Sequence, residues 1–187
     1  MKSVLISIKP KWCEMIASGK KTIEVRKTRP KCDTPFKCYI YCTSSELLTR
    51  SHYNGKIYVA TNKKYQNELE RVGNTTLSGK VIGEFICNKI DRLAVCGYDS
   101  RNTELRRVDD NLTAYNLDYD YLNRCQLSLE NLKKYSNGSG LYGWHISDLV
   151  IYDEPKSIKE FYHYGVVRGA KVTRPPQSWC YAEELEQ

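Results

Sequence analysis

The stretch Gly19–Lys20–Lys21–Thr22–Ile23–Glu24–Val25–Arg26 is the clearest structural signal in this sequence. Glycine is typical of the position just after a helix, so Gly19 predicts the end of one. From Thr22 onward, apolar and polar residues alternate, which is typical of a strand with one buried face. Ile23 and Val25 share one face of that strand. The stretch therefore predicts a helix–turn–strand unit.

Outward from this unit, residues 3–8 predict a strand, and Pro10 predicts the start of the helix that Gly19 ends. Further strands are predicted at 36–43, 57–60, 81–90 and 141–152 (the last broken near 147–148), and short helices at 62–71, 129–135 and 155–161. Regular β-α alternation is absent, which argues against a doubly wound sheet or a TIM barrel. We predict an α+β, mainly β fold: a small mixed or antiparallel β-barrel with short flanking helices.

Two segments interrupt this pattern, at about 44–79 and 91–124. The first has only a short strand and a polar helix, and the second is charged and weakly periodic. We interpret both as insertions or long loops. The chain is then a single domain spanning 1–187, a length that fits one domain.

The net charge of +7 is concentrated at the start of the chain. Residues 1–37 contain ten basic and three acidic residues, a surplus equal to that of the whole chain. Such a cluster favours an anionic partner such as nucleic acid, although a solvated basic face is the alternative. No apolar run of about 18 residues and no secretion signal is present, so we expect a cytoplasmic protein that does not interact with membranes.

The eight cysteines do not have the spacing of a metal site. No Cys-x-x-Cys pair occurs, and a structural zinc needs four ligands, usually at local spacing. We interpret the thiols as small buried apolar groups. The sequence therefore predicts no metal and no cofactor.

Three charged residues of the opening stretch are candidates for chemistry. Glu24 and Arg26 project from the same face of the predicted strand, with Lys21 at its entrance. Together they can present an acceptor and a planar donor fork to a ligand, and a desolvated lysine can act as a base or nucleophile. The alternative is a solvated, charged strand face.

The pattern Gly19-x-Lys21-x-x-Glu24-x-Arg26 resembles the Gly-x-Lys-x-x-Glu-x-Arg signature of the ASCH domain family. The tail at 174–181 is similar to the endings of phage-associated and Firmicute members. The resemblance implies a PUA-like β-barrel and a cleft, lined by the motif, that binds RNA or a nucleotide.

The resemblance implies ligand-binding roles for the motif residues Lys21, Glu24 and Arg26. The basic cluster adds Lys9 and Arg29 as candidate ligand-binding residues. Two enzyme precedents exist in the family: an amidohydrolase of acetylated cytidine nucleosides and a ribonuclease. In the first, the catalytic lysine maps onto Lys21, whereas the catalytic threonine maps onto Glu24. If the chain is a hydrolase, Lys21 and Glu24 are the candidate catalytic residues. An interaction protein that uses the barrel as a scaffold is a third alternative.

The roles of other polar and aromatic residues are left open by the sequence. Trp144 and His145 lie on opposite faces of a predicted strand, and His145 is either a general base or a hydrogen-bonded structural residue. The tail at 174–181 either closes the cleft or fastens the chain end to the barrel.

Overall fold

The computed structural model describes residues 1–51, 54–60, 74–97, 103–165 and 169–185. The helix predicted at 62–71 lies outside these residues. The chain divides into two compact units, one formed by 1–19, 36–86 and 148–187 and the other by 20–35 and 87–147.

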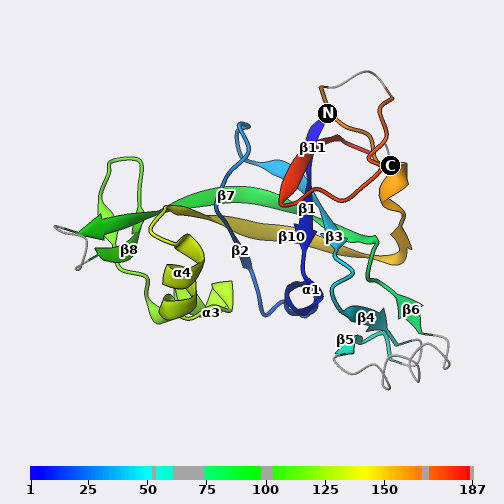
Figure 1. Cartoon of the computed structure of the whole chain (residues 1–187), viewed down its shortest axis with the longest axis horizontal. Helices are drawn as coiled ribbons and strands as arrows, with labels where there is room; N and C mark the ends of the chain where they lie inside the picture. Colours follow the sequence, from blue (N-terminus) through cyan, green and yellow to red (C-terminus); the bar gives the residue numbers. More distant parts are fainter. Residues whose placement is uncertain (52–53, 61–73, 98–102, 166–168, 186–187) are drawn as a thin grey trace. The chain divides into compact units, whose positions relative to one another are not determined.

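The described elements are mainly strands, and Figure 1 traces them in chain order. They are β1 (Lys2–Ile8), α1 (Pro10–Ala17), β2 (Ile23–Arg26), β3 (Phe36–Cys42), β4 (Leu47–Arg50), β5 (Ile57–Ala60), β6 (Thr75–Thr76), β7 (Val81–Gly97), β8 (Thr103–Val108), β9 (Ala114–Tyr115), α3 (Tyr119–Cys125), α4 (Leu129–Ser136), β10 (Leu141–Lys156), the 3₁₀ helix η1 (Ile158–Glu160) and β11 (Trp179–Glu183).

The first unit is organised around β1, which pairs in parallel with β3 and antiparallel with β11. Its residues from Ser3 to Ser7 are nearly inaccessible to solvent, as expected for a central strand with both faces covered. Helix α1 follows with Pro10 at its first position, and Gly19 has the positive φ of +73° that ends the turn. Strands β4, β5 and β6 form a separate antiparallel sheet in this unit.

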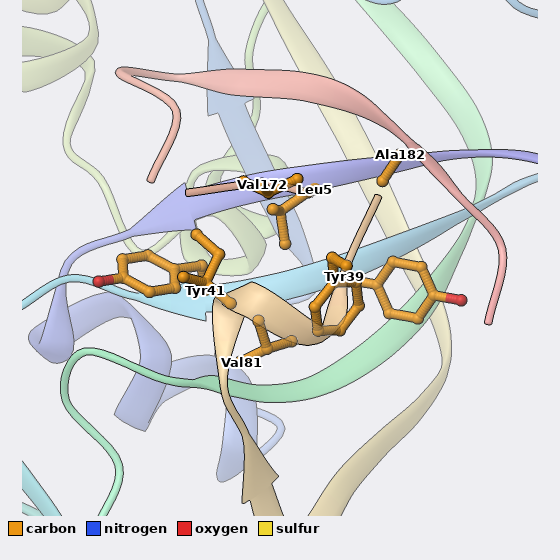
Figure 2. Packing of buried hydrophobic residues seen from close by; sticks show 8 residues of the cluster. Leu5, Tyr39, Tyr41, Val81, Val172 and Ala182 are labelled. Carbon is orange, nitrogen blue, oxygen red and sulfur yellow. The ribbon is translucent and has the colours of Figure 1, made fainter. Parts of the chain in front are cut away.

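The core of the first unit joins residues distant in sequence (Figure 2). Its members are all buried: Leu5, Tyr39, Tyr41, Val81, Ile158, Phe161, Val172 and Ala182. Tyr39 meets Phe161 edge to face, with 4.9 Å between ring centroids. The Tyr39 hydroxyl accepts a hydrogen bond from the Leu185 amide at 2.9 Å, which ties the segment after β11 to this core.

The second unit contains β2, paired antiparallel with the first part of β10, and the hairpin formed by the end of β7 with β8. Strand β9 continues this hairpin. Asp118 and Ser128 cap α3 and α4 through their side chains, which satisfies amide groups that the helices leave free. The core brings apolar residues of β2, β7, β8, β10 and both helices together: Ile23, Val25, Leu93, Leu105, Tyr121, Cys125, Leu132 and Leu141.

The α+β, mainly β class predicted from the sequence is confirmed. The hydrogen-bonded order β11–β1–β3–β7–β10–β2 is an open path among the described residues, so closure into a barrel is not confirmed. Segment 91–124 contains more regular structure than its weak periodicity predicts, because it holds the end of β7, β8, β9 and most of α3. The break predicted near 147–148 is a left-handed residue, Asp148 at φ +48°, inside a continuous β10. The single-domain organisation stays a prediction.

Candidate functional site

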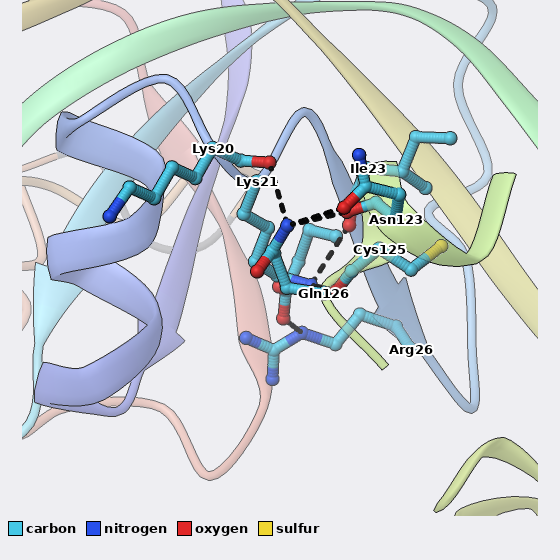
Figure 3. Close-up of polar contacts among 8 residues, drawn as sticks. Lys20, Lys21, Ile23, Arg26, Asn123, Cys125 and Gln126 are labelled. Carbon is cyan, nitrogen blue, oxygen red and sulfur yellow. Dashed lines mark hydrogen bonds and ion pairs between the residues drawn. The ribbon is translucent and has the colours of Figure 1, made fainter. Parts of the chain in front are cut away.

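Lys21 is the most deeply buried charged residue of the motif, with only 2% of its surface exposed. Its Nζ donates hydrogen bonds to the carbonyl oxygens of Ile23, at 2.9 Å, and Cys125, at 2.6 Å. The same nitrogen lies 3.3 Å from Glu24 Oε2. Since an ammonium has three N–H groups, these three partners occupy all of them (Figure 3).

Glu24 stands between two cations. Its second oxygen, Oε1, is 3.0 Å from Arg26 Nε, and the carboxylate side chain is 7% exposed. We call Lys21, Glu24 and Arg26 the motif cluster. A buried charge is tolerated when it is paired. Each member of the cluster has an ion-pair partner, and Lys21 is also hydrogen-bonded to two carbonyl groups. The alternative of a solvated charged face, open from the sequence, is wrong for Lys21 and Glu24, because tertiary packing covers them.

The end of α3 holds the turn that carries the motif. Gln126 adopts a left-handed conformation at φ +55° and donates from Nε2 to the carbonyls of Asn123, at 2.7 Å, and Lys20, at 3.3 Å. In Figure 3 the Lys20 ammonium points away from the motif cluster. Arg124 Nε donates to Thr22 Oγ1 at 3.2 Å. The end of α3 thus holds the turn through the Lys20 carbonyl and the Thr22 hydroxyl.

Strand β10 contributes two aromatic residues beside the motif. Trp144 lies opposite Glu24, and Tyr142 lies opposite Arg26 in the antiparallel register. Cross-strand partners project from the same face, so both rings flank the charged side chains. Trp144 is fully buried, whereas Tyr142 is half-buried. Between them, Gly143 leaves space for Tyr121, because a Cβ at this position would overlap the Tyr121 hydroxyl.

A shallow depression of about 520 Å³ opens next to this strand pair. We call it the basic hollow; it is lined by residues 27–31 and by Tyr142. Lys27, Arg29 and Lys31 are exposed, and Arg29 Nε makes only a long hydrogen bond of 3.4 Å to the Pro30 carbonyl. The hollow therefore combines exposed positive charge with one half-buried aromatic ring.

A second ionic group surrounds the buried Asp91. His145 Nε2 is 2.6 Å from Asp91 Oδ2, and Lys89 Nζ is 2.9 Å from Oδ1. Burial opposes the charge of Asp91, but the bonds from His145 and Lys89 outweigh it and lower the pKa of the carboxyl to about 2. Arg124 Nη2 lies 3.3 Å from His145 Nδ1.

These contacts fix the state of the imidazole. A guanidinium only donates, so Nδ1 of His145 accepts from Arg124 while Nε2–H donates to Asp91. Both ring nitrogens are therefore occupied. Of the two roles left open by the sequence, the geometry favours the hydrogen-bonded structural histidine.

The structure brings Lys21, Glu24 and Arg26 together and places Arg29 in the basic hollow. Lys9 belongs to the other unit, where it is exposed just before α1. Sequence reasoning missed Tyr142. The alternation that put Trp144 on the motif face could have identified it, since the two residues are two positions apart in one strand.

Five of the cysteines are buried, as predicted, and Cys32, Cys96 and Cys180 are half-buried. All eight are free, and burial raises the pKa of the Cys87 and Cys125 thiols to about 12. Among the residues that the structure describes, no group of three metal-ligating side chains is found. No helix in the described ranges is long and apolar enough to cross a membrane.

The fold has counterparts among solved structures. The chain is similar to the crystal structure of ASCH from Zymomonas mobilis, with a TM-score of 0.55 and 19% identity over 96% of this chain and 86% of that one. Two single-residue variants of the same protein match with TM-scores of 0.55 and 0.56, also at 19% identity, over 96% and 97% of this chain and 87% and 90% of theirs. No protein-family model and no curated protein matches the sequence. The chain thus shares the fold of these ASCH structures.

Proposed function

We propose that this chain is an ASCH-type protein that binds RNA or a nucleotide in the basic hollow beside the motif strand. The observation that supports this most directly is Tyr142, a half-buried ring among the cations of residues 27–31. An aromatic ring beside flexible positive charges is the common arrangement for single-stranded nucleic acids, because a base stacks on the ring while phosphates meet the cations.

The residues take distinct roles in this proposal. Arg29, Lys27 and Lys31 contact phosphate groups, and Tyr142 stacks on a base. Arg26, whose side chain is 11% exposed, lies opposite Tyr142 and reaches the ligand at the edge of the motif cluster. Lys21 and Glu24 act mainly by holding Arg26, because the Lys21 ammonium is fully engaged. Lys9, in the other unit, is retained as a proposed phosphate contact.

Binding of a fluorescently labelled, mixed-sequence single-stranded RNA of about ten nucleotides tests the proposal. Its log affinity should fall linearly with log salt, by about 0.7 per phosphate contacted. Tyr142→Ala should weaken binding about tenfold, the usual size of one stacking contact. Arg29→Gln should reduce the salt slope by about 0.7.

Lys20→Gln is the matched control, because it removes one charge near the motif from a side chain that points away from it. It should change affinity less than Arg29→Gln does. Salt-insensitive binding, or equal effects of Tyr142→Ala and Lys20→Gln, would contradict the proposal. So would a wild-type chain that binds neither RNA nor nucleotides at low salt.

The hydrolytic alternative, with Lys21 as nucleophile or base and Glu24 beside it, remains a prediction from the resemblance. Chemistry at Lys21 Nζ first requires that one of its three bonds, to Ile23, Cys125 or Glu24, is broken. Turnover of acetylated cytidine or of RNA that is lost in Lys21→Met, in a protein that still folds, would support it. The PUA-like barrel and the phage-associated or Firmicute subtype belong to the same proposal.

A further inference from the structure

A larger cavity lies next to the basic hollow in the same unit, with a volume of about 870 Å³. Its walls are residues 89–92 of β7, residues 107–110 at the end of β8, and the turn that leads into β9. It shares Arg29 and Tyr142 with the basic hollow. We call it the arginine pocket, and its size is in the range of small-molecule sites.

Arg107 is the distinctive residue of this pocket. Its guanidinium lies over two rings, 5.5 Å from the centroid of Tyr115 and 5.8 Å from that of Tyr121. No carboxylate among the described residues lies within ion-pair distance of it. The neighbouring Arg106 differs, since its Nη2 is 2.8 Å from Glu104 Oε2. Arg107 is therefore held in place by ring faces, with its planar donor fork still available.

The acidic residues of the wall are largely committed to other partners. Asp91 is paired with His145 and Lys89. Asp109 Oδ1 accepts from the amides of Asn111, at 3.0 Å, and Thr113, at 2.8 Å. The third acid of the lining, Asp110, is exposed. Asp91 and Asp109 are thus held by their own partners, and the guanidiniums of Arg29, Arg92 and Arg107 are the donors that the wall offers to an anionic ligand.

The rim is also preorganised. The hydrogen bond from the Thr113 amide is the main cause of the lowered pKa of Asp109, so the turn holds this residue as a carboxylate. Tyr115 donates from its hydroxyl to Asp109 Oδ2 at 3.1 Å, which fixes the ring that lies under Arg107. A site whose donors are fixed before binding loses less entropy when the ligand arrives.

We infer that the arginine pocket binds a phosphate group of a nucleotide, with Arg107 as its bidentate donor. Arginine suits this role because its fork matches two phosphate oxygens. Arg92, exposed on the adjacent strand, and Arg29 supply further positive charge at the same cavity. The inference rests on the proposed function, because the phosphate belongs to the same RNA or nucleotide that stacks on Tyr142. The nucleotide is either free or part of an RNA chain.

The first experiment compares cytidine with cytidine 5′-monophosphate by isothermal titration. The wild-type chain should bind the monophosphate about tenfold more tightly or better, the usual value of a charge-assisted contact. Arg107→Gln should abolish this preference, and Arg107→Lys, which keeps the charge but not the fork, should retain part of it. Arg106→Gln is the matched control and should leave the preference intact. Thermal unfolding of each variant establishes that it is folded.

The second experiment identifies the source of the phosphate, using a labelled RNA octamer with either a 5′-phosphate or a 5′-hydroxyl. If Arg107→Gln loses affinity only for the 5′-phosphorylated octamer, the pocket binds a terminal phosphate. If it loses affinity equally for both octamers, the pocket binds an internal phosphate. Either result supports the inference. Effects of Arg107→Gln and Arg106→Gln that agree within twofold for every probe would overturn it. If Tyr142→Ala still weakens RNA binding in that case, the proposed function stands; no binding in the wild type overturns both.

Discussion

In the motif cluster, two cations lie within 3.3 Å of one carboxylate, and the side chains are at most 11% exposed. In the arginine pocket, Arg107 rests on two rings and Arg92 is exposed, while Asp91 and Asp109 are bound to other partners. The two regions contain similar residue types, but the first satisfies its charges internally and the second leaves them for a ligand. The residues that form a recognisable sequence motif are therefore not those most available for binding.

The largest effect that tests this comparison is on stability. Glu24→Gln removes the only negative charge between Lys21 and Arg26, so two buried cations lose their partner. Breaking a buried pair in this way costs about 3 kcal/mol of unfolding free energy. Urea unfolding followed by circular dichroism measures it, with the exposed Glu130→Gln of the same unit as control, for which a much smaller change is expected.

The double variant Glu24→Gln/Arg26→Met sharpens this result. It removes one of the two cations that have lost their carboxylate and keeps the bonds of Lys21 to the Ile23 and Cys125 carbonyls, so it should recover part of the stability lost in Glu24→Gln. If Glu24→Gln were no more destabilising than Glu130→Gln, the motif cluster would not be the internally neutralised element described above.

The next effect is on the pH dependence of stability and concerns Asp91 in the pocket wall. The folded state lowers its pKa from 3.8 to about 2, so the carboxylate stabilises the fold fully above pH 5 and less as the pH falls toward 2. This contribution amounts to about 2 kcal/mol. Urea midpoints between pH 6 and 2.5 should fall more steeply for the wild type than for Asp91→Asn. Parallel curves for the two proteins would contradict the stabilising role of the Asp91 carboxylate.

The smallest effect concerns the turn at the pocket rim. Leu112 has φ +61° and is 74% exposed, a conformation that glycine adopts without strain. Leu112→Gly should therefore stabilise the fold by about 0.5 kcal/mol, seen as a rise in the thermal midpoint. Asn111→Gly, at a neighbour without positive φ, should lower the midpoint instead. A lower thermal midpoint in both variants would contradict the claim that the backbone at Leu112 is strained.

The sequence predicted the motif strand well because its information is local. Alternation placed Ile23 in the core and Glu24 on the opposite face, and Gly19 marked the end of α1, all as observed. The burial of Lys21 could not be predicted, because it depends on the carbonyl of Cys125, 104 positions away.

The arginine pocket was missed for the same reason. Residues 103–108 are charged and resemble a solvated loop in sequence, but pairing Leu93 with Arg107 gives them a strand register. That register decides which of two adjacent arginines enters the pocket, and no local pattern distinguishes Arg106 from Arg107. Tyr115 and Tyr121, which hold Arg107, come from two further elements.

The close contact at Gly143 has a consequence for sequence divergence. Any larger residue at 143 would displace the Tyr121 ring, and this ring also supports Arg107. In chains of this fold that have drifted to low identity, the two positions should change together: glycine at 143 accompanies a large ring at 121, and a bulkier residue accompanies a smaller one. Such paired substitutions would let a lineage gain or lose the arginine pocket without altering the motif.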